Sequence, residues 1–242
     1  MKPKFYFSKA LLYRLWILAL LVFPILILYP ISYRLIRLAI VLLGGVILLG
    51  TIYLFSKPKI IRVGCIILSI LTLIFLVSPS WQVSGDTLRK DYVRELSQYE
   101  GTKYVWGGTS KFGIDCSGLV RQSLIQANIK QGLLTLNSDL IRHAIVLWWN
   151  PAAVDALIDG YHNYTKINGR FISINQIDYA RIQPGDLAAT VDRVHILAYL
   201  GNQTWIEADP TINKVIKVQI PEPNNYWFNT PVYLLQWQEF SS

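Results

Sequence analysis

Cys116 is the residue of this 242-residue chain whose type and setting best suit covalent chemistry. It opens an apolar run with helical spacing, formed by Leu119, Val120, Leu124 and Ile125. A thiol in the first turn of a helix meets unsatisfied backbone N–H groups and the positive end of the helix dipole, which favour the nucleophilic thiolate. A lone cysteine is more often a buried structural residue. The flanking Asp115 and Ser117, with several glycines close by, favour a reactive cysteine here.

His195 is the candidate base for this thiol. Residues 194–200 and 204–207 have the composition of two strands joined by a Gly201-Asn202 turn. Pairing about Gly201 places His195 directly opposite Glu207, with Cβ atoms about 4.5–5.5 Å apart. A carboxylate in that position accepts the second ring N–H and stabilises the imidazolium. The sequence therefore predicts a Cys-His-Glu arrangement.

Asp209 is the alternative carboxylate for orienting His195. It lies two residues beyond Glu207 and diagonally across the predicted hairpin. Its other roles would be an ion pair with Arg193 or a cap on the turn before Pro210. Because directly opposed residues lie closer than diagonal ones, Glu207 is preferred.

The remaining histidines and cysteine do not extend this set. His143 lies in an apolar stretch and His162 among polar residues, so each is expected to be structural or solvated. No CxxC, HExxH or clustered histidines appear, and neither a metal nor another cofactor is predicted. Cys65 lies in an apolar run far from Cys116, which makes a disulfide framework implausible.

Four short motifs follow one another in the second half of the chain. They are residues 104–108 (Tyr-Val-Trp-Gly-Gly), 115–120 (Asp-Cys-Ser-Gly-Leu-Val), 183–188 (Gln-Pro-Gly-Asp-Leu-Ala) and 195–202 (His-Ile-Leu-Ala-Tyr-Leu-Gly-Asn). In this order they resemble the NlpC-type, papain-like cysteine peptidases of bacterial cell walls. Four ordered motifs are far more specific than any one short pattern.

The resemblance implies roles for further residues. The third catalytic residue of the family, usually His, Asn or Gln, falls at Glu207, so glutamate is a departure there. The hydroxyl of Tyr104 would point into the site, and Asp115 with Ser117 would help to bind a substrate amine or peptide end. Alternatively, Tyr104 packs in the core and Asp115 caps the cysteine helix. The implied substrate is the peptidoglycan stem peptide, cleaved between γ-D-glutamate and a diamino acid.

The predicted reaction is acyl transfer. The Cys116 thiolate attacks an amide carbonyl, His195 protonates the leaving amine, and water hydrolyses the thioester. The backbone N–H of Cys116, at the start of its helix, would stabilise the oxyanion.

The elements that must position these residues predict an α+β fold, in which a helix bearing the cysteine packs on an antiparallel sheet. A short amphipathic helix is expected over 86–99, and the cysteine helix is expected to stop near Asn128. Strands are expected at 187–190, 194–200, 204–206, 215–220 and 232–237.

Residues 129–170 look like an insertion relative to the family. They hold an apolar run over 140–149 and a predicted helix over 152–161. The insertion would form a lid, a substrate wall or a membrane-resting surface, the last motivated by Trp148 and Trp149. Ordinary core and loop is an equally good interpretation.

Three uncharged apolar runs come before this domain. They cover residues 15–33, 38–56 and 63–82, each close to the ~20 residues that cross a bilayer as a helix. A cleaved signal peptide fits poorly because the region is long and contains three runs. The glycines of the second run are interpreted as merely tolerated. The predicted organisation is a membrane anchor over 1–82 and a peptidase domain over 83–242.

Charge predicts the orientation of the anchor. The first eighty residues hold nine basic and no acidic residues, and the rest hold 14 basic against 15 acidic. The net charge of +8 therefore flanks apolar segments and forms no phosphate-binding face, so nucleic acid is not an expected partner. More basic residues lie in the N-terminal tail and around 57–62 than around 34–37. The positive-inside rule places the tail in the cytoplasm and the peptidase domain outside a bacterial cytoplasmic membrane.

Two other functions remain open from the sequence. One is a papain-like amidase or acyltransferase acting on lipid or lipoprotein, motivated by the apolar 140–149 run next to a membrane anchor. The other is a catalytically inactive binding module that kept the fold, which the intact Cys116, His195 and Glu207 argue against. The sequence identifies no protein partner.

Overall fold

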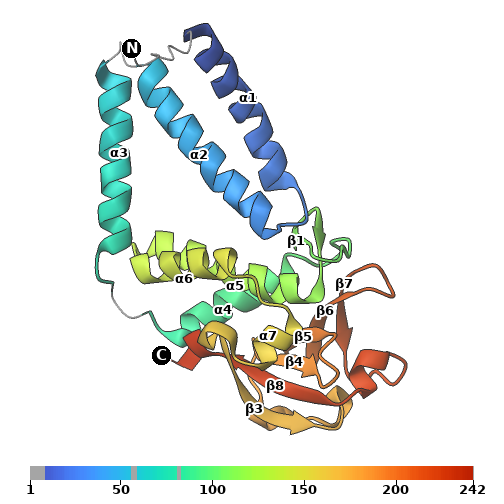
Figure 1. The fold of residues 1–242 in the computed structure, drawn as a ribbon. Coiled ribbons are helices and arrows are strands. Elements are labelled where there is room, and N and C mark those ends of the chain that lie inside the picture. Colours follow the sequence, from blue (N-terminus) through green and yellow to red (C-terminus); the bar gives the residue numbers. More distant parts are fainter. Residues whose placement is uncertain (1–8, 56–58, 81–82, 242) are drawn as a thin grey trace.

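The computed structural model describes residues 9–55, 59–80 and 83–241. Three long helices project from one side of a mixed domain that contains the rest of the chain (Figure 1). The predicted ends of the second and third apolar runs, residues 56 and 82, lie outside the described residues.

The three long helices are α1 (Lys9–Leu28), α2 (Arg34–Leu54) and α3 (Lys59–Val77). With 19 to 21 residues each, they are long and apolar enough to cross a membrane, as the apolar runs predict. Their large apolar side chains are mostly exposed, since the helices contact each other only along narrow seams. The α1–α2 connection and the end of α3 lie beside the mixed domain (Figure 1).

Trp16 and Gly50 hold α1 against α2. The indole N–H of Trp16 lies 3.2 Å from the carbonyl oxygen of Ile47 and 3.1 Å from the hydroxyl of Thr51. A Cβ on Gly50 would lie 2.6 Å from the indole ring. The interpretation of this glycine as merely tolerated is therefore wrong, because a side chain here would push the helices apart. Gly45 has open space around it, so tolerance is the right interpretation there.

A six-stranded antiparallel sheet forms the centre of the mixed domain, in the order β3-β8-β4-β5-β6-β7. The strands are β3 (Thr165–Phe171), β4 (Leu187–Thr190), β5 (Ile196–Gly201), β6 (Thr204–Asp209), β7 (Lys214–Gln219) and β8 (Val232–Trp237). The predicted strands 187–190 and 232–237 are confirmed to the residue. The edge strand β3 was not predicted, because its exposed, largely polar residues lack the β-branched pattern of a buried strand.

Helices cover one face of this sheet. They are α4 (Gly85–Ser97), α5 (Cys116–Leu134), α6 (Ser138–Trp149) and α7 (Val154–Ile158). Helix α5 packs between α4 and α6 and against β5 and β6, which places its first residue near the middle of the sheet. A two-stranded ribbon, β1 (Thr109–Ser110) and β2 (Gly113–Ile114), precedes α5. The predicted α+β fold, with a cysteine-bearing helix on an antiparallel sheet, is confirmed.

Short 3₁₀ turns cover the other face of the sheet. They include η2 (Ile174–Gln176), η3 (Tyr179–Arg181) and η4 (Tyr226–Asn229), while η1 (Tyr161–Asn163) and η5 (Gln238–Ser241) lie at other edges. Under them a second core forms around Trp205 and Phe228, both fully buried. The central strands of the sheet are therefore buried on both faces, so a polar side chain there needs a specific partner.

The cysteine helix is longer than predicted, ending at Leu134 and not near Asn128. Asn128 is tolerated inside the helix because its amide donates to the carbonyl of Leu124 and to the carboxylate of Glu239. These bonds remove the tendency of asparagine to end a helix by bonding the local backbone elsewhere. The actual boundary is Leu136, with φ of 51°, followed by Asn137, whose side chain caps α6.

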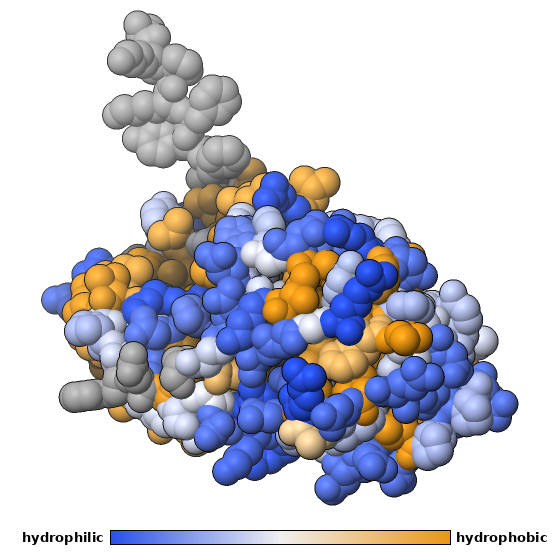
Figure 2. Space-filling model, turned by 90° about the horizontal axis from the view of Figure 1, so that it is seen from below, coloured by the Kyte–Doolittle hydropathy of each residue, from blue (hydrophilic) through white to orange (hydrophobic). Residues whose placement is uncertain are grey.

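Helix α6, inside the predicted insertion, lies between the rest of the mixed domain and the apolar helices (Figure 1). Its residues Leu140, Ala144 and Leu147 are buried as the apolar run requires, and α5 is the helix it contacts most. Arg142 donates to the carbonyl oxygens of Leu76 and Ser78 at the end of α3, at 2.6 and 3.2 Å. The membrane-resting role of this segment stays a prediction. The domain face turned away from the three helices is mostly hydrophilic, with interrupted apolar patches (Figure 2).

Candidate active site

Cys116 is the first residue of α5, as predicted from the sequence. Asp115 caps this helix: one carboxylate oxygen accepts from the backbone N–H of Gly118 at 2.5 Å and from the hydroxyl of Ser117 at 3.0 Å. The other oxygen accepts from the N–H of Gly107 at 2.8 Å. The capping alternative for Asp115 is therefore observed, and the cap ties the glycine-rich turn to the start of the cysteine helix.

Gly118 allows this close approach. A Cβ at this position would lie 2.1 Å from the carbonyl oxygen of Gly108, a backbone atom that cannot swing aside. Gly107 in the turn has φ of +73°, a conformation that other residues adopt at a cost. Gly118 is therefore required for steric reasons, and Gly107 for its backbone conformation.

Gly118→Ala is expected to destabilise the domain by about 1–3 kcal/mol, because the turn and α5 must separate to admit a methyl group. Chemical denaturation of the full-length protein, followed by tryptophan fluorescence, measures this loss. Gly45→Ala is the matched control, since a Cβ there meets no atom within 4 Å. An unchanged unfolding midpoint for Gly118→Ala would contradict the steric argument.

His195 immediately precedes β5 and is almost completely buried. Thr190 holds its backbone: the N–H of His195 donates to the Thr190 hydroxyl at 3.0 Å, and its carbonyl accepts from the N–H of Thr190 at 2.9 Å. The imidazole stacks on the indole of Trp227, with ring centroids 4.2 Å apart and planes at 24°. The ring is therefore fixed in position and orientation before any substrate binds.

Glu207 is the partner of the imidazole. Its Oε2 lies 2.7 Å from Nε2 of His195, and both side chains are inaccessible to solvent. The second carboxylate oxygen, Oε1, accepts from the side-chain amide of Asn225 at 2.8 Å. Because Nε2 is engaged by the carboxylate, Nδ1 is the ring nitrogen left for the thiol.

The hairpin register differs from the prediction. Tyr199 pairs with Trp205 and Ala198 with Ile206, so continuing this register would place Asp209, not Glu207, opposite His195. The turn residues are Asn202 and Gln203, both with positive φ, in place of the predicted Gly201-Asn202. The shift is two residues, and since strand side chains alternate faces with period two, Glu207 stays on the same face. The predicted contact therefore forms although the predicted register is wrong.

Asp209 does not contact His195 through any hydrogen bond of the described residues. Its Oδ1 accepts from the N–H groups of Thr211 and Ile212, at 2.6 and 3.1 Å. This is the turn-capping role given as an alternative in the sequence. The other alternative, an ion pair with Arg193, does not form, since Arg193 donates to Asp159 at 2.9 Å.

The charge state of His195 follows from competing effects. Burial alone would lower the pKa of this imidazole, but hydrogen bonding to the Cys116 thiol and to the Glu207 carboxylate outweighs it and raises the pKa to about 9. The thiol sulfur also lies 4.0 Å from the carbonyl oxygen of Val194, the residue before His195. The three predicted residues thus meet in one place, and the imidazolium is the favoured form at neutral pH.

A cleft of about 560 Å³ opens at Cys116. Tyr104, Asp115 and Ser117 line it, as the sequence predicts. Burial raises the pKa of Tyr104 to about 12, with further contributions from Cys116 and Asp115, so its hydroxyl stays protonated as a hydrogen-bond donor. The volume is in the range of small-ligand sites. The Asp115 carboxylate already accepts three hydrogen bonds from its own surroundings, whereas Tyr104 offers a donor at the cleft wall.

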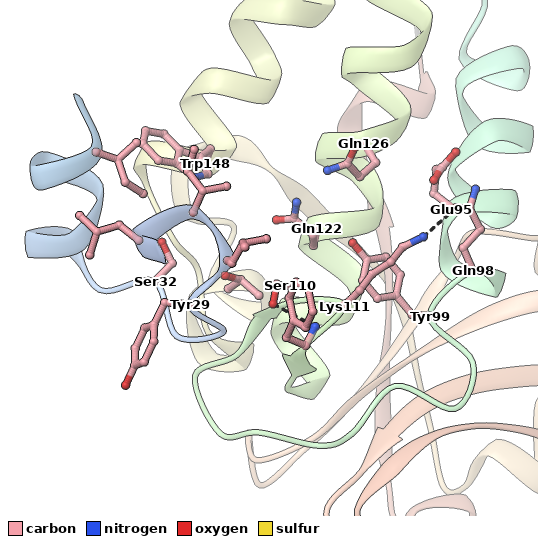
Figure 3. A pocket seen from close by; sticks show the side chains of 16 residues that line it. Tyr29, Ser32, Glu95, Gln98, Tyr99, Ser110, Lys111, Gln122, Gln126 and Trp148 are labelled. Carbon is pink, nitrogen blue, oxygen red and sulfur yellow. Dashed lines mark hydrogen bonds between the residues drawn. The ribbon is translucent and has the colours of Figure 1, made fainter. Parts of the chain in front are cut away.

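A second cavity, of about 490 Å³, lies on the other side of the α1–α2 connection. Trp148 faces it from α6, Gln122 and Gln126 from α5, Glu95 from α4 and Gln98 from just beyond the end of α4 (Figure 3). Lys111 donates to Gln98 at 3.2 Å across its rim. None of the residues lining it is a cysteine, a serine with a base, or a histidine. It therefore offers no second nucleophilic centre.

The two other histidines lie elsewhere. His143 is half-exposed on α6, with Nδ1 3.5 Å from a carboxylate oxygen of Glu239. His162 stacks on Tyr164 at a ring-centroid distance of 5.5 Å. Neither lines the cleft at Cys116. Within the described residues, no group of three or more His, Cys, Asp or Glu is arranged to hold a metal ion.

Sequence reasoning missed three residues of this site: Thr190, Asn225 and Trp227. Thr190 ends β4, between the third and fourth motifs, whereas Asn225 and Trp227 belong to the segment around η4, distant in sequence from the motifs. The spacing Asn225-x-Trp227 carries a local signal, since the asparagine side chain accepts from the N–H of Trp227 and starts the turn. Nothing in that signal says which residue the indole would cover.

A family model described as the NlpC/P60 family matches residues 101–233, which is more than half of the chain. No curated protein matches the sequence. The matched region contains all seven residues predicted for the site.

Several solved structures align with the chain. NlpC2 from Trichomonas vaginalis is 19% identical over 64% of this chain and 48% of its own, with a TM-score of 0.41. The P60 domain of an antigen from M. avium subspecies paratuberculosis is 17% identical over 63% and 96%, with a TM-score of 0.38. The peptidoglycan hydrolase RipB from Mycobacterium tuberculosis is 21% identical over 62% and 65%, with a TM-score of 0.39. The chain spans about half the length of the Trichomonas vaginalis protein.

Proposed function

Because the chain belongs to the NlpC/P60 family, we propose that it is a membrane-anchored cysteine peptidase that hydrolyses an amide bond in the peptide stems of peptidoglycan. The single observation that carries the proposal is the buried His195–Glu207 pair, 2.7 Å apart, beside the thiol of Cys116 at a helix start. A binding module has no use for a buried charged pair that costs solvation energy to maintain.

In the proposed mechanism the Cys116 thiolate attacks the amide carbon, and the carbonyl π electrons move to the oxygen. The backbone N–H of Cys116 at the start of α5 donates to that oxyanion. When the intermediate collapses, the C–N bond breaks and the amine takes a proton from the His195 imidazolium, leaving a thioester. His195, now neutral, removes a proton from water, whose oxygen attacks the thioester and releases the carboxylic acid and the thiolate.

Glu207 acts through His195 in this scheme. Its carboxylate accepts the N–H of Nε2, which holds Nδ1 toward the sulfur and stabilises the imidazolium between the two proton transfers. Asn225 and Trp227 would in turn hold the carboxylate and the ring, respectively. Tyr104 and Ser117, at the cleft wall, are the proposed contacts for the substrate peptide.

The substrate class is tested by incubating the full-length protein in detergent with muropeptides and, separately, with lipid amides. Mass analysis of muropeptide digests is expected to show two fragments whose masses add up to the substrate plus one water. Products from lipid amides alone would instead support the lipid amidase alternative. Binding of muropeptide without any product would support a binding module.

We further propose that residues 1–82 anchor the domain 83–242 outside a bacterial cytoplasmic membrane. The mixed domain lies at the same end as the α1–α2 connection (Figure 1). Lys9, Arg14, Lys59 and Arg62 lie toward the opposite end, where Lys/Arg enrichment favours the cytoplasmic side. Of the two arginines near the domain, Arg37 is buried against it, which lowers the basic charge exposed at that end.

Topology is tested with a reporter joined after Ser242. An alkaline phosphatase fusion, which is active only outside the cytoplasm, is expected to show high activity, and a matched cytoplasmic fluorescent fusion little signal. The reverse pattern would rule out action on the cell wall. Fusions at residue 57, in the α2–α3 connection, are the control and are expected to give the opposite result.

A further inference from the structure

The membrane anchor forms part of the cleft wall. Ser32, Tyr33, Arg34 and Arg37, from the α1–α2 connection and the start of α2, line the same cavity as Cys116. The connection is fixed to the glycine-rich turn, since the N–H of Thr109 donates to the carbonyl of Pro30 at 2.8 Å and Ile31 forms a bridge with Gly108. A soluble domain cut from this chain would therefore lack one wall of its site.

Arg37 is the unusual residue of that wall. It is only 2% exposed, yet it lines a cavity. Its Nε donates to the hydroxyl of Ser32 at 2.9 Å, and its guanidinium carbon lies 5.9 Å from the centroid of the Trp148 ring. Its Nη1 is buried and has no hydrogen-bond partner in the described part of the chain. A buried guanidinium N–H without an acceptor destabilises the protein, unless a ligand supplies the acceptor.

A second arginine adds to the same positive charge. Arg121, from α5, is 6% exposed, lines the cleft and donates through Nη1 to the carbonyl of Ala152 at 2.9 Å. It lies close enough to Arg37 for the two to repel each other. The Asp115 carboxylate attracts Arg121 electrostatically, but its oxygens already accept hydrogen bonds from Gly107, Ser117 and Gly118.

One helix N-terminus reinforces this charge. Helix α2 begins at Arg34 with no acidic residue in its first turn and no side-chain cap, whereas the start of α5 is capped by Asp115. Unsatisfied N–H groups at helix starts favour anions. The cleft is lined by four arginines, Arg34, Arg37, Arg121 and Arg193, and by two carboxylates, Asp115 and Asp155, so positive charge is in excess.

We propose that Arg37 of the membrane anchor, with Arg121, binds a carboxylate of the substrate peptide while Cys116 attacks the neighbouring amide. The inference rests on the proposed peptidase function and specifies its substrate as a peptide with a free carboxylate near the scissile bond. A peptide carboxylate is favoured over a lipid phosphate because the arginine lies in the cavity that contains the nucleophile, and a planar carboxylate accepts both donors of a guanidinium.

The test uses full-length protein in zwitterionic lipid nanodiscs and two stem peptides that differ only in a carboxylate or a carboxamide beside the scissile bond. The wild type is expected to cleave the carboxylate peptide with about 10- to 100-fold higher kcat/KM, the range for a charge-assisted hydrogen bond. Arg37→Gln is expected to lose that preference, because its kcat/KM decreases for the carboxylate peptide and stays unchanged for the carboxamide peptide. Arg37→Lys is expected to keep part of the preference. Arg14→Gln, which removes an exposed arginine of α1, is the matched control and should behave as wild type.

Equal cleavage of the two peptides by the wild type would overturn the inference. An equal decrease of kcat/KM for both peptides in Arg37→Gln would overturn it as well. Loss of the preference in nanodiscs of anionic lipid would assign the site to a lipid phosphate and also overturn it. Should Arg37→Gln fail to fold, the comparison of peptides with unmodified protein still decides. Calorimetric binding of both peptides to Cys116→Ala separates this inference from catalysis: equal affinities overturn it, whereas the absence of cleavage by the wild type counts only against the peptidase.

Discussion

Cys116→Ala is expected to lower the hydrolysis of muropeptides by at least about 10⁴-fold. Cys116 is the only thiol among the described side chains of the cleft, and the neighbouring hydroxyl of Ser117 is hydrogen-bonded to the Asp115 carboxylate and not to an imidazole, so it is a much poorer nucleophile. Although only 6% of the residue is exposed, replacing the thiol by hydrogen changes the side-chain volume little, so the fold should persist. The measurement is the initial rate of fragment release by full-length protein, followed by mass analysis.

Cys65→Ala is the matched control, because that thiol lies on α3 outside the mixed domain. It is expected to hydrolyse muropeptides at the wild-type rate. A Cys116→Ala protein that retains even a tenth of the wild-type rate would remove the thiol from the mechanism and point to a different nucleophile. A circular dichroism spectrum equal to that of the wild type confirms that the loss is chemical.

Glu207→Gln is expected to lower kcat/KM by about 10- to 100-fold, since the amide oxygen can still accept the N–H of Nε2 but lacks the negative charge that stabilises the imidazolium. It also changes the pH profile. The pKa of His195 is about 9, with the Glu207 carboxylate among the groups that raise it. Removing that charge lowers the pKa, so the imidazolium is lost earlier as the pH rises. The alkaline limb of the rate profile therefore moves to lower pH, measured as kcat/KM from pH 5 to about pH 10.

Asp209→Asn separates the two carboxylates considered for this role. Since Asp209 caps the turn at Thr211 and Ile212, its loss is expected to reduce stability by about 1 kcal/mol and to leave the alkaline limb in place. If Asp209→Asn shifted that limb and Glu207→Gln did not, the assignment of the orienting carboxylate would be reversed.

Local sequence patterns predicted most of the elements around the site. The 86–99 helix is observed as α4, with Leu88, Tyr92 and Leu96 buried as their spacing requires. Strand β3 and the last turns of α5 were missed, because each depends on partners far away in sequence. Thr165–Phe171 becomes a strand only by pairing with β8, and Asn128 stays helical only through Glu239.

The hairpin shows why a contact can be predicted better than a register. His195 and Glu207 lie on one face whether the strands pair about one turn or slip by two residues, because side chains alternate. The slip was decided by the turn, where Asn202 and Gln203 both adopt positive φ. Continued along the strands, that register would bring Asp209 opposite His195, yet the imidazole bonds to Glu207, and Asp209 bonds to the following turn.

By itself, the sequence determined the cysteine at a helix start, the histidine and carboxylate on adjacent strands, and three apolar helices, because periodicity and capping act over a few neighbouring residues. The tertiary structure alone decided that Trp227 covers the imidazole, that Asn225 holds Glu207 and that Arg37 of α2 reaches the cleft. Those contacts join segments that no local pattern links. They form because a buried charge or donor must find a partner wherever the packed chain supplies one.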